Sequence, residues 1–265
     1  MPLMFNALWD YRYFVFSTVK REFQTRYRAS LLGAFWTVAQ PLTMILIYTV
    51  VFGQIMQPSI SGHEETPYAF SLYLCAGVIF WGLFSETLTR MTTVFVDHAT
   101  LIKKTAFPRV CLPAIVTGTA LVNFSIILGL YLFFLVLVKH MPGPVILVVL
   151  PLLAIQLSIA IGLGLLLGTI NVFFRDAAQF VVVLLQFWFW LTPIVYIKDI
   201  VPAKYQQILE LNPLEPLMSA YQGIFLEHAV PDFDSLLFPI SFALICLTTG
   251  GWIFRRHSTQ LADEL

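Results

Sequence analysis

Long apolar runs separated by short polar segments dominate the sequence. A helix needs about 20 apolar residues to cross the hydrocarbon layer of a bilayer. Six runs reach about this length, and each predicts a membrane-spanning helix. They cover Ala34–Met56, Phe70–Met91, Val110–Val138, Val145–Ile170, Ala178–Ile197 and Ser235–Phe254. We therefore expect an all-α integral membrane protein with six transmembrane helices.

The N-terminal residues 1–33 follow a different pattern. Phe16, Val19, Phe23 and Tyr27 recur on one helical face, and charged side chains lie around the other. This pattern is typical of a helix lying in the membrane surface, although an amphipathic helix packed on a partner would show it too. The charges also leave no uninterrupted apolar core, so we expect no cleavable signal peptide.

The segment between the last two predicted spans, residues 198–234, is also amphipathic. Its Asn212-Pro213-Leu214-Glu215 sequence predicts a helix start, with Asn as the cap, Pro first and Glu three residues after the cap. We predict a re-entrant helical hairpin at about 200–228; a helical cap resting on the outer headgroups is the alternative. The two helices are expected at Ala203–Leu211 and Pro213–Glu227.

Lysine and arginine are distributed unequally among the loops. Twelve lie in the N-terminal segment, the loop after the second span, at Arg175 and in the tail, whereas Lys139, Lys198 and Lys204 occupy the other loops. Cytoplasmic loops carry an excess of positive residues, so both termini are predicted to be cytoplasmic. The expected organisation is a cytoplasmic N-terminus (1–33), a transmembrane domain (34–254) and a cytoplasmic tail (255–265).

Composition supports the membrane assignment. Of 265 residues, 58% are hydrophobic and 11% are charged, against about 25% charged in soluble domains. Net charge is zero, which gives no indication of a nucleic-acid partner. Cys75, Cys111 and Cys246 are far apart and are interpreted as small apolar residues.

Sequence patterns of catalysis are weak. The chain has no G-K-[ST] phosphate loop, no H-E-x-x-H and no C-x-x-C pair. Asp232-Phe-Asp234 imitates a metal-binding D-x-D, but a solvated acidic loop explains it better. We predict no catalytic residue, no metal site and no cofactor bound by this chain.

Two charged residues fall inside a predicted span. Glu86 and Arg90 are four residues apart, so they share a helix face and can pair. A structural ion pair facing the bundle is the favoured interpretation. In the fourth span, Ala160, Gly164 and Gly168 form a small-residue stripe with Gly162 beside it, which predicts close helix packing.

Aromatic side chains are abundant, and some lie where an interfacial belt does not explain them. One hypothesis is that these rings line a conduit and stack on sugars. For Trp81 the alternative is contact with lipid. For the cluster in the fifth predicted span (Phe187, Trp188 and Trp190) the alternative is a role in the interfacial belt or in packing. The candidates are Phe80, Trp81, Phe84, Phe187, Trp188 and Trp190.

Four short segments together form a family pattern. They are Arg26–Trp36 leading into Gln40-Pro41-Leu42, Leu101–Arg109, Asn171–Asp176 and Leu211–Leu214. In this order the chain resembles the permease subunit of polysaccharide-exporting ABC transporters, which export O-antigen, capsular polysaccharide or teichoic acid. The resemblance covers nearly the whole chain.

The resemblance implies a mechanism and partners. Two copies of the permease would pair in the cytoplasmic (inner) membrane, and each would dock a separate nucleotide-binding subunit that binds ATP and Mg²⁺. The loop at about 97–109 is similar to the family's coupling helix, with Phe107 as an apolar anchor and Pro108 as its stop. The residues expected to contact the ATPase are Leu101, Lys103, Lys104, Phe107, Pro108, Arg109, Arg175 and Asp176.

The resemblance also implies roles in substrate handling. Arg26 and Arg28 would receive the pyrophosphate of a polyprenyl-diphosphate-linked polysaccharide, or else attract anionic lipid headgroups. The hairpin around Asn212 and Pro213 would form the outer gate. The expected function is export of lipid-linked polysaccharide, with O-antigen as the favoured substrate. An ABC permease for a drug or lipid, and a membrane enzyme acting on lipid-linked sugars, are the competing hypotheses.

Overall fold

The computed structural model describes residues 9–28, 33–52, 68–104, 108–258, 260 and 264. Every regular element in these ranges is a helix, so the all-α prediction is confirmed for this part of the chain. The α-helices are α2 (Arg12–Arg28), α3 (Gly33–Val50), α4 (Ala69–Asp97), α5 (Ala99–Lys104), α6 (Cys111–Leu137), α7 (Val149–Phe173), α8 (Asp176–Trp190), α9 (Ala203–Glu210), α10 (Glu215–Leu226) and α11 (Phe233–His257). The 3₁₀ helices are η2 (Gly143–Val148) and η3 (Lys198–Ile200).

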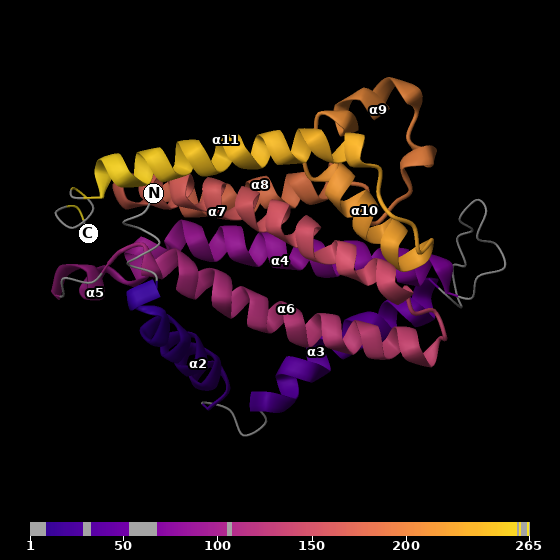
Figure 1. The fold of residues 1–265 in the computed structure, drawn as a ribbon, viewed down its shortest axis with the longest axis horizontal. Helices are drawn as coiled ribbons and strands as arrows, with labels where there is room; N and C mark the ends of the chain where they lie inside the picture. The colour runs from indigo at the N-terminus through magenta and orange to yellow at the C-terminus, as the bar shows by residue number, and fades with distance from the viewer. Residues whose placement is uncertain are drawn as a thin grey trace.

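The long helices lie side by side in an elongated bundle, and α2 crosses it at a steep angle (Figure 1). The short helix α5 and the C-terminus of α11 lie at one end, which we call the α5 end. Helices α9 and α10 lie toward the opposite end, which we call the α10 end. The ATPase-contact and gate candidates therefore occupy opposite ends of the molecule.

Within the described residues, four helical segments are long and apolar enough to cross a membrane by themselves. They are Ala69–Asp97, Cys111–Leu137, Gly143–Phe173 and Phe233–His257. The observed helix Cys111–Leu137 nearly coincides with the predicted span Val110–Val138. The predicted span Ala178–Ile197 is wrong in extent, because α8 ends at Trp190 and the chain then turns through Pro193. The end of the first predicted span, residues 53–56, lies outside the described residues.

Helix α4 occupies the centre of the bundle. It contacts α3, α6, α7, α8 and α10, and most of its side chains are buried. A large apolar core surrounds its first two thirds and includes α10. A second core lies at the α5 end and joins residues of α4, α5, α6, α7 and α11. Its buried members are Met91, Val94, Phe95, Ile102, Leu112, Ile115, Val116, Leu165, Val172 and Phe254.

The predicted small-residue packing in α7 is confirmed. A Cβ atom on Gly164 would lie 2.4 Å from the Met91 side chain of α4. On the neighbouring face of α7, Gly162 meets Gly250 of α11 so closely that a Cβ on Gly250 would lie 2.1 Å from the Gly162 carbonyl oxygen. Glycine at these positions lets α7 approach α4 and α11 almost backbone to backbone.

Candidate functional site

The segment expected to contact an ATPase begins directly after α4. His98 caps α4, and its carbonyl oxygen accepts hydrogen bonds from the amides of Leu101 and Ile102 in α5. The Ile102 side chain is buried in the second core, whereas Lys103 is exposed. Helix α5 is thus fixed to the bundle by one face and leaves the Lys103 side chain exposed at the α5 end.

Other members of this predicted segment are placed less completely. The backbone of Lys104 is helical, but its side chain lies outside the described part of the structure, as does all of Phe107. Pro108 and Arg109 are half-buried, and the carbonyl oxygen of Pro108 accepts the amide of Cys111. Pro108 therefore leads the chain into α6.

Arg175 and Asp176 lie in the tight connection between α7 and α8. Both side chains are exposed, and Asp176 is the first residue of α8, where the helix dipole favours a carboxylate. Asn171 stabilises this turn, because its Oδ1 atom accepts the amide of Ala178 at 3.1 Å. The connection presents polar groups at the end of a transmembrane-length helix.

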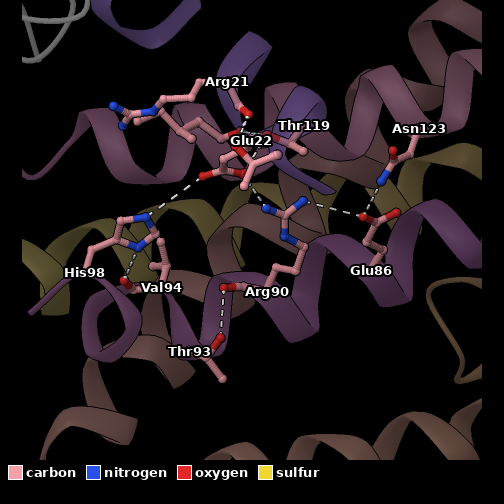
Figure 2. A network of polar contacts seen from close by, with 11 residues as sticks. Arg21, Glu22, Glu86, Arg90, Thr93, Val94, His98, Thr119 and Asn123 are labelled. Atoms are coloured by element: carbon pink, nitrogen blue, oxygen red, sulfur yellow. Dashed lines mark hydrogen bonds and ion pairs between the residues drawn. The ribbon is translucent and has the colours of Figure 1, made fainter. Parts of the chain in front are cut away.

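A polar network lies between α2, α4 and α6 (Figure 2). Arg90 donates from Nη2 to Oε2 of Glu22 at 2.7 Å, and its Nη1 lies 3.5 Å from Oε1 of Glu86. The pairing expected from sequence is therefore present, but the shorter contact of Arg90 is with a different helix. Thr119 donates to Glu22 at 3.1 Å, and Asn123 donates to Glu86 at 2.7 Å.

The network also reaches the junction of α4 with α5. His98 Nε2 lies 3.9 Å from Oε1 of Glu22, while its Nδ1 contacts the Val94 carbonyl at 3.0 Å. Sequence reasoning missed Glu22, His98, Thr119 and Asn123. Glu22 stands among basic residues on an amphipathic helix, so its spacing suggested a solvated face.

Helix α2 itself shows two faces. Val19 packs on α6, where a Cβ on Gly118 would lie 3.1 Å from it, whereas Phe16 is 71% exposed. Trp9 and Tyr13 continue the exposed aromatic side, and Arg12 lies over both rings. The predicted single apolar face is thus divided between protein contact and an exposed stripe.

Arg26 and Arg28, the proposed phosphate ligands, belong to the last turn of α2. Their backbone is helical, but their side chains lie outside the described part of the structure.

The hairpin predicted between the last two spans consists of α9 and α10, with α10 deeply embedded. Most side chains of α10 are buried, and the helix packs against α4. The helix starts at Glu215, two residues later than predicted, because Pro213 and Leu214 form a turn. Asn212 does not cap the first helical turn; instead its Oδ1 accepts the amide of Leu214 at 3.0 Å.

Asn212 holds this turn against α8. Trp188 donates from Nε1 to Asn212 Oδ1 at 2.8 Å, and Asn212 Nδ2 donates to the Thr192 hydroxyl at 2.9 Å. The Asn212 side chain is nearly buried, so its loss would leave Trp188 without this partner.

Both ends of α10 carry further polar contacts. At its start, Lys198 Nζ lies 3.1 Å from Oε1 of the buried Glu215. After its end, the rings of His140 and His228 lie 4.5 Å apart, and His140 Nε2 contacts the Leu226 carbonyl at 3.0 Å. Partial burial and the neighbouring His140 lower the pKa of His228.

The aromatic candidates separate into two groups. Phe80 and Phe84 are fully buried and Trp81 is nearly so; Phe80 stacks on Tyr221 with ring centroids 3.6 Å apart. In this structure these three rings fill the core and present no open face to a sugar. Phe187 and Trp190 are largely exposed on α8, whereas Trp188 packs edge-on against Phe84 and bonds Asn212.

The arrangement contains no catalytic constellation among the described residues. No group of three or more His, Cys, Asp or Glu side chains there is placed to hold a metal ion. Instead, apolar membrane-length helices carry a small polar segment at one end, and at the other end the α9–α10 hairpin, of which α10 is buried. This anatomy suits a membrane transport subunit.

Comparison with known proteins places this anatomy in a family. Residues 13–226 match the model of the ABC-2 type transporter membrane domain, and the chain belongs to this family. It is therefore a multi-pass membrane transport subunit.

Individual relatives align along nearly the whole chain. The chain is 31% identical over 267 residues, covering both proteins completely, to the O-antigen export system permease protein RfbA of Myxococcus xanthus. It is 29% identical to RfbA of Klebsiella pneumoniae over 92% of each chain. The polysialic acid transport protein KpsM of Escherichia coli is 22% identical over 91% of this chain and 92% of its own length.

Proposed function

We propose that this chain is the permease of an ATP-driven exporter that moves lipid-linked polysaccharide, with O-antigen as the favoured substrate. The observation that carries the proposal is the full-length similarity to an O-antigen export permease at 31% identity. The exposed α5 segment and the embedded α10 hairpin lie at opposite ends of the bundle, as a driven and gated conduit requires.

The exporter would contain two copies of this chain and two separate ATPase subunits. ATP and Mg²⁺ would bind to those subunits, which would contact α5 and the Arg175-Asp176 turn. The large exposed apolar faces of α8 and α11 are suited to lipid or to the second copy. The polysaccharide would carry a polyprenyl diphosphate, whose charge suits the arginines at the end of α2.

A six-span topology agrees with the dimensions of the two shorter helices. Helix α3 has 18 residues and α8 has 15, which correspond to lengths of about 27 Å and 22 Å. The hydrocarbon layer is about 30 Å thick, so both nearly cross it. The turns at 191–197 would extend α8 to the outer surface, and the α9–α10 hairpin would re-enter behind it.

The orientation follows from charge. Lys103, Arg109 and Arg175 lie at the α5 end, whereas Lys198 and Lys204 lie beside the hairpin. Together with the positive N-terminal helix and tail, this distribution supports a cytoplasmic position for the α5 end and both termini. Labelling from outside intact cells should therefore modify Lys204→Cys but leave Lys103→Cys unmodified.

Deletion of the gene tests the proposed function. Surface polysaccharide should be lost and lipid-linked polymer should accumulate inside the cell, as measured by gel analysis and sugar staining of separated fractions. The wild-type gene should restore export. Normal surface glycan combined with altered drug tolerance would instead support a drug or lipid permease, and loss of polymer synthesis would support the enzyme hypothesis.

A second experiment tests the ATPase contact. The double variant Phe107→Ala, Arg109→Ala should abolish export while the protein stays in the membrane, because it removes an apolar anchor and a charge. Lys204→Ala, which removes an exposed charge at the opposite end, is the matched control and should export normally. Undiminished export by the double variant would refute the contact.

A further inference from the structure

We infer that Glu22 is a coupling residue, which makes helix α2 move together with the end of α4 from which the proposed ATPase-facing helix α5 continues. The inference rests on the proposed function, since it requires that a nucleotide-driven movement reaches α5. It assigns to a single carboxylate on α2 a role that neither its position in the sequence nor its helix pattern indicates.

Oε2 of this carboxylate accepts two hydrogen bonds, whereas Oε1 lies 3.9 Å from Nε2 of His98, beyond hydrogen-bond distance. Oε2 accepts from Arg90 of α4 at 2.7 Å and from Thr119 of α6 at 3.1 Å. Oε1 faces His98, which lies between the last residue of α4 and the first of α5. One side chain of α2 therefore contacts two long helices and the residue from which α5 begins (Figure 2).

The apolar contacts join the same elements. Phe14, Val15 and Val19 of α2 pack on the second core, which also contains Ile102 of α5. Apolar contacts alone permit sliding, because they have no preferred direction. The Glu22 contacts add a directional restraint to this shared core, so a displacement of α5 changes the position that α2 must adopt.

The charge pair is difficult to separate during such a displacement. The Glu22 and Arg90 side chains are each 25% exposed, and the 2.7 Å contact is a charge-assisted hydrogen bond. Separating this pair would leave the partly buried Glu22 carboxylate without Arg90, in a medium less polar than water. A rigid displacement of α2 together with the end of α4 and α5 keeps the pair intact and is therefore favoured.

The next helix in the chain, α3, is the element on which a movement of α2 would act. Helix α3 follows α2 in the chain and contacts α2, α4 and α6. Pro41 and Ile45 are the only buried side chains among those that the structure describes in α3. A shift of α2 would therefore reach α3 through their direct contact.

The test uses the exporter purified with its own ATPase subunits and reconstituted in liposomes. Spin labels at Gln24→Cys and Thr100→Cys, both exposed positions, report the distance between α2 and α5 after the native cysteines are replaced by alanine. In the otherwise wild-type protein this distance should stay the same with and without ATP. In Glu22→Gln it should broaden or change when ATP is added.

Transport should fall more than ATP hydrolysis. We expect Glu22→Gln to export about tenfold less polysaccharide than wild type, a typical size for the loss of one coupling interaction. Its ATPase rate should stay within about twofold of wild type, since Glu22 would contact no nucleotide. Lys20→Gln, which removes an exposed charge from the same helix, should leave the label distance, transport and ATPase rate unchanged.

The outcomes separate the hypotheses. An unchanged label distance together with normal export in Glu22→Gln would overturn the coupling role, and so would an equal loss of ATPase activity and export. Glu22→Asp keeps the charge but shortens the side chain, and the same criteria apply to it if Glu22→Gln does not accumulate in the membrane. A wild-type complex that exports no glycan would refute the proposed function, whereas the label distance would still decide the coupling role.

Discussion

The close crossing of α7 and α11 gives a sharp prediction for stability. A Cβ atom on Gly250 would lie 2.1 Å from the carbonyl oxygen and 2.9 Å from the carbonyl carbon of Gly162. These are backbone atoms in the middle of a helix, so they cannot rotate away as a side chain can. We therefore expect Gly250→Ala to force the two helices apart.

The cost follows from the geometry. Ordinary contact begins at 3.4 Å, so the helices must separate locally by about 1.3 Å, the difference from 2.1 Å. A gap of this size removes much of the dispersion energy along the crossing, and we expect a loss of about 3 kcal/mol. At Gly251 no atom of the described residues lies within 4 Å of the position that a Cβ would take, so Gly251→Ala should be neutral or stabilising by up to about 1 kcal/mol.

Thermal unfolding of the purified protein, followed by tryptophan fluorescence, measures the difference. Gly250→Ala should unfold at least about 6 °C below Gly251→Ala. Cys246, which is 4% exposed beside the crossing, should also react faster with a maleimide in Gly250→Ala when Cys75 and Cys111 are replaced. Equal unfolding temperatures for the two adjacent variants would refute the close crossing.

Three other predictions concern the α10 end. Asn212→Ala should lower stability by about 2 kcal/mol in thermal unfolding, because Trp188 loses its buried acceptor. Tyr221→Phe should be neutral or slightly stabilising, because the hydroxyl is buried without a hydrogen-bond partner among the described residues. The pKa of His228 is lowered in the folded protein, so the locally unfolded form of the segment after α10 binds more protons as the pH falls. Proteolysis after α10 should therefore increase below about pH 6.5, the ordinary pKa of histidine. The variant His228→Gln should remove this dependence.

The presence of most helices could be predicted from the sequence, because it depends on the local pattern of apolar residues. The apolar run Val110–Val138 corresponds to the observed Cys111–Leu137 within one residue at each end. The same reasoning failed at Ala178–Ile197, where apolar character continues beyond the point at which the helix ends. Hydropathy measures preference for the bilayer, whereas helix extent depends on backbone hydrogen bonds that Pro193 interrupts.

Contacts between helices were less predictable than contacts within one. The spacing of Glu86 and Arg90 identified a pair on one helix face, because positions four residues apart are neighbours. The closer partner, Glu22, lies 68 residues away in sequence. No periodicity within α2 distinguishes a carboxylate that faces α4 from one that faces water.

Aromatic residue type did not distinguish a buried ring from an exposed one. Phe80 and Phe187 have the same side chain, but Phe80 is fully buried and Phe187 is 68% exposed. Both environments accept an apolar ring, so the residue type gives no preference between them. The difference arises from the docking of α10 on α4, which covers Phe80 with Tyr221.

The central position of α4 has a mechanical consequence. With 29 residues, this helix is about 44 Å long. Arg90 lies in its second half, toward α5, and Phe80 lies in its first half, stacked on the hairpin residue Tyr221. If α4 tilts as a rigid body, a small rotation at the α5 end displaces its opposite end. Substitutions at Arg90 and Tyr221 should therefore affect transport non-additively, although the two side chains share no contact.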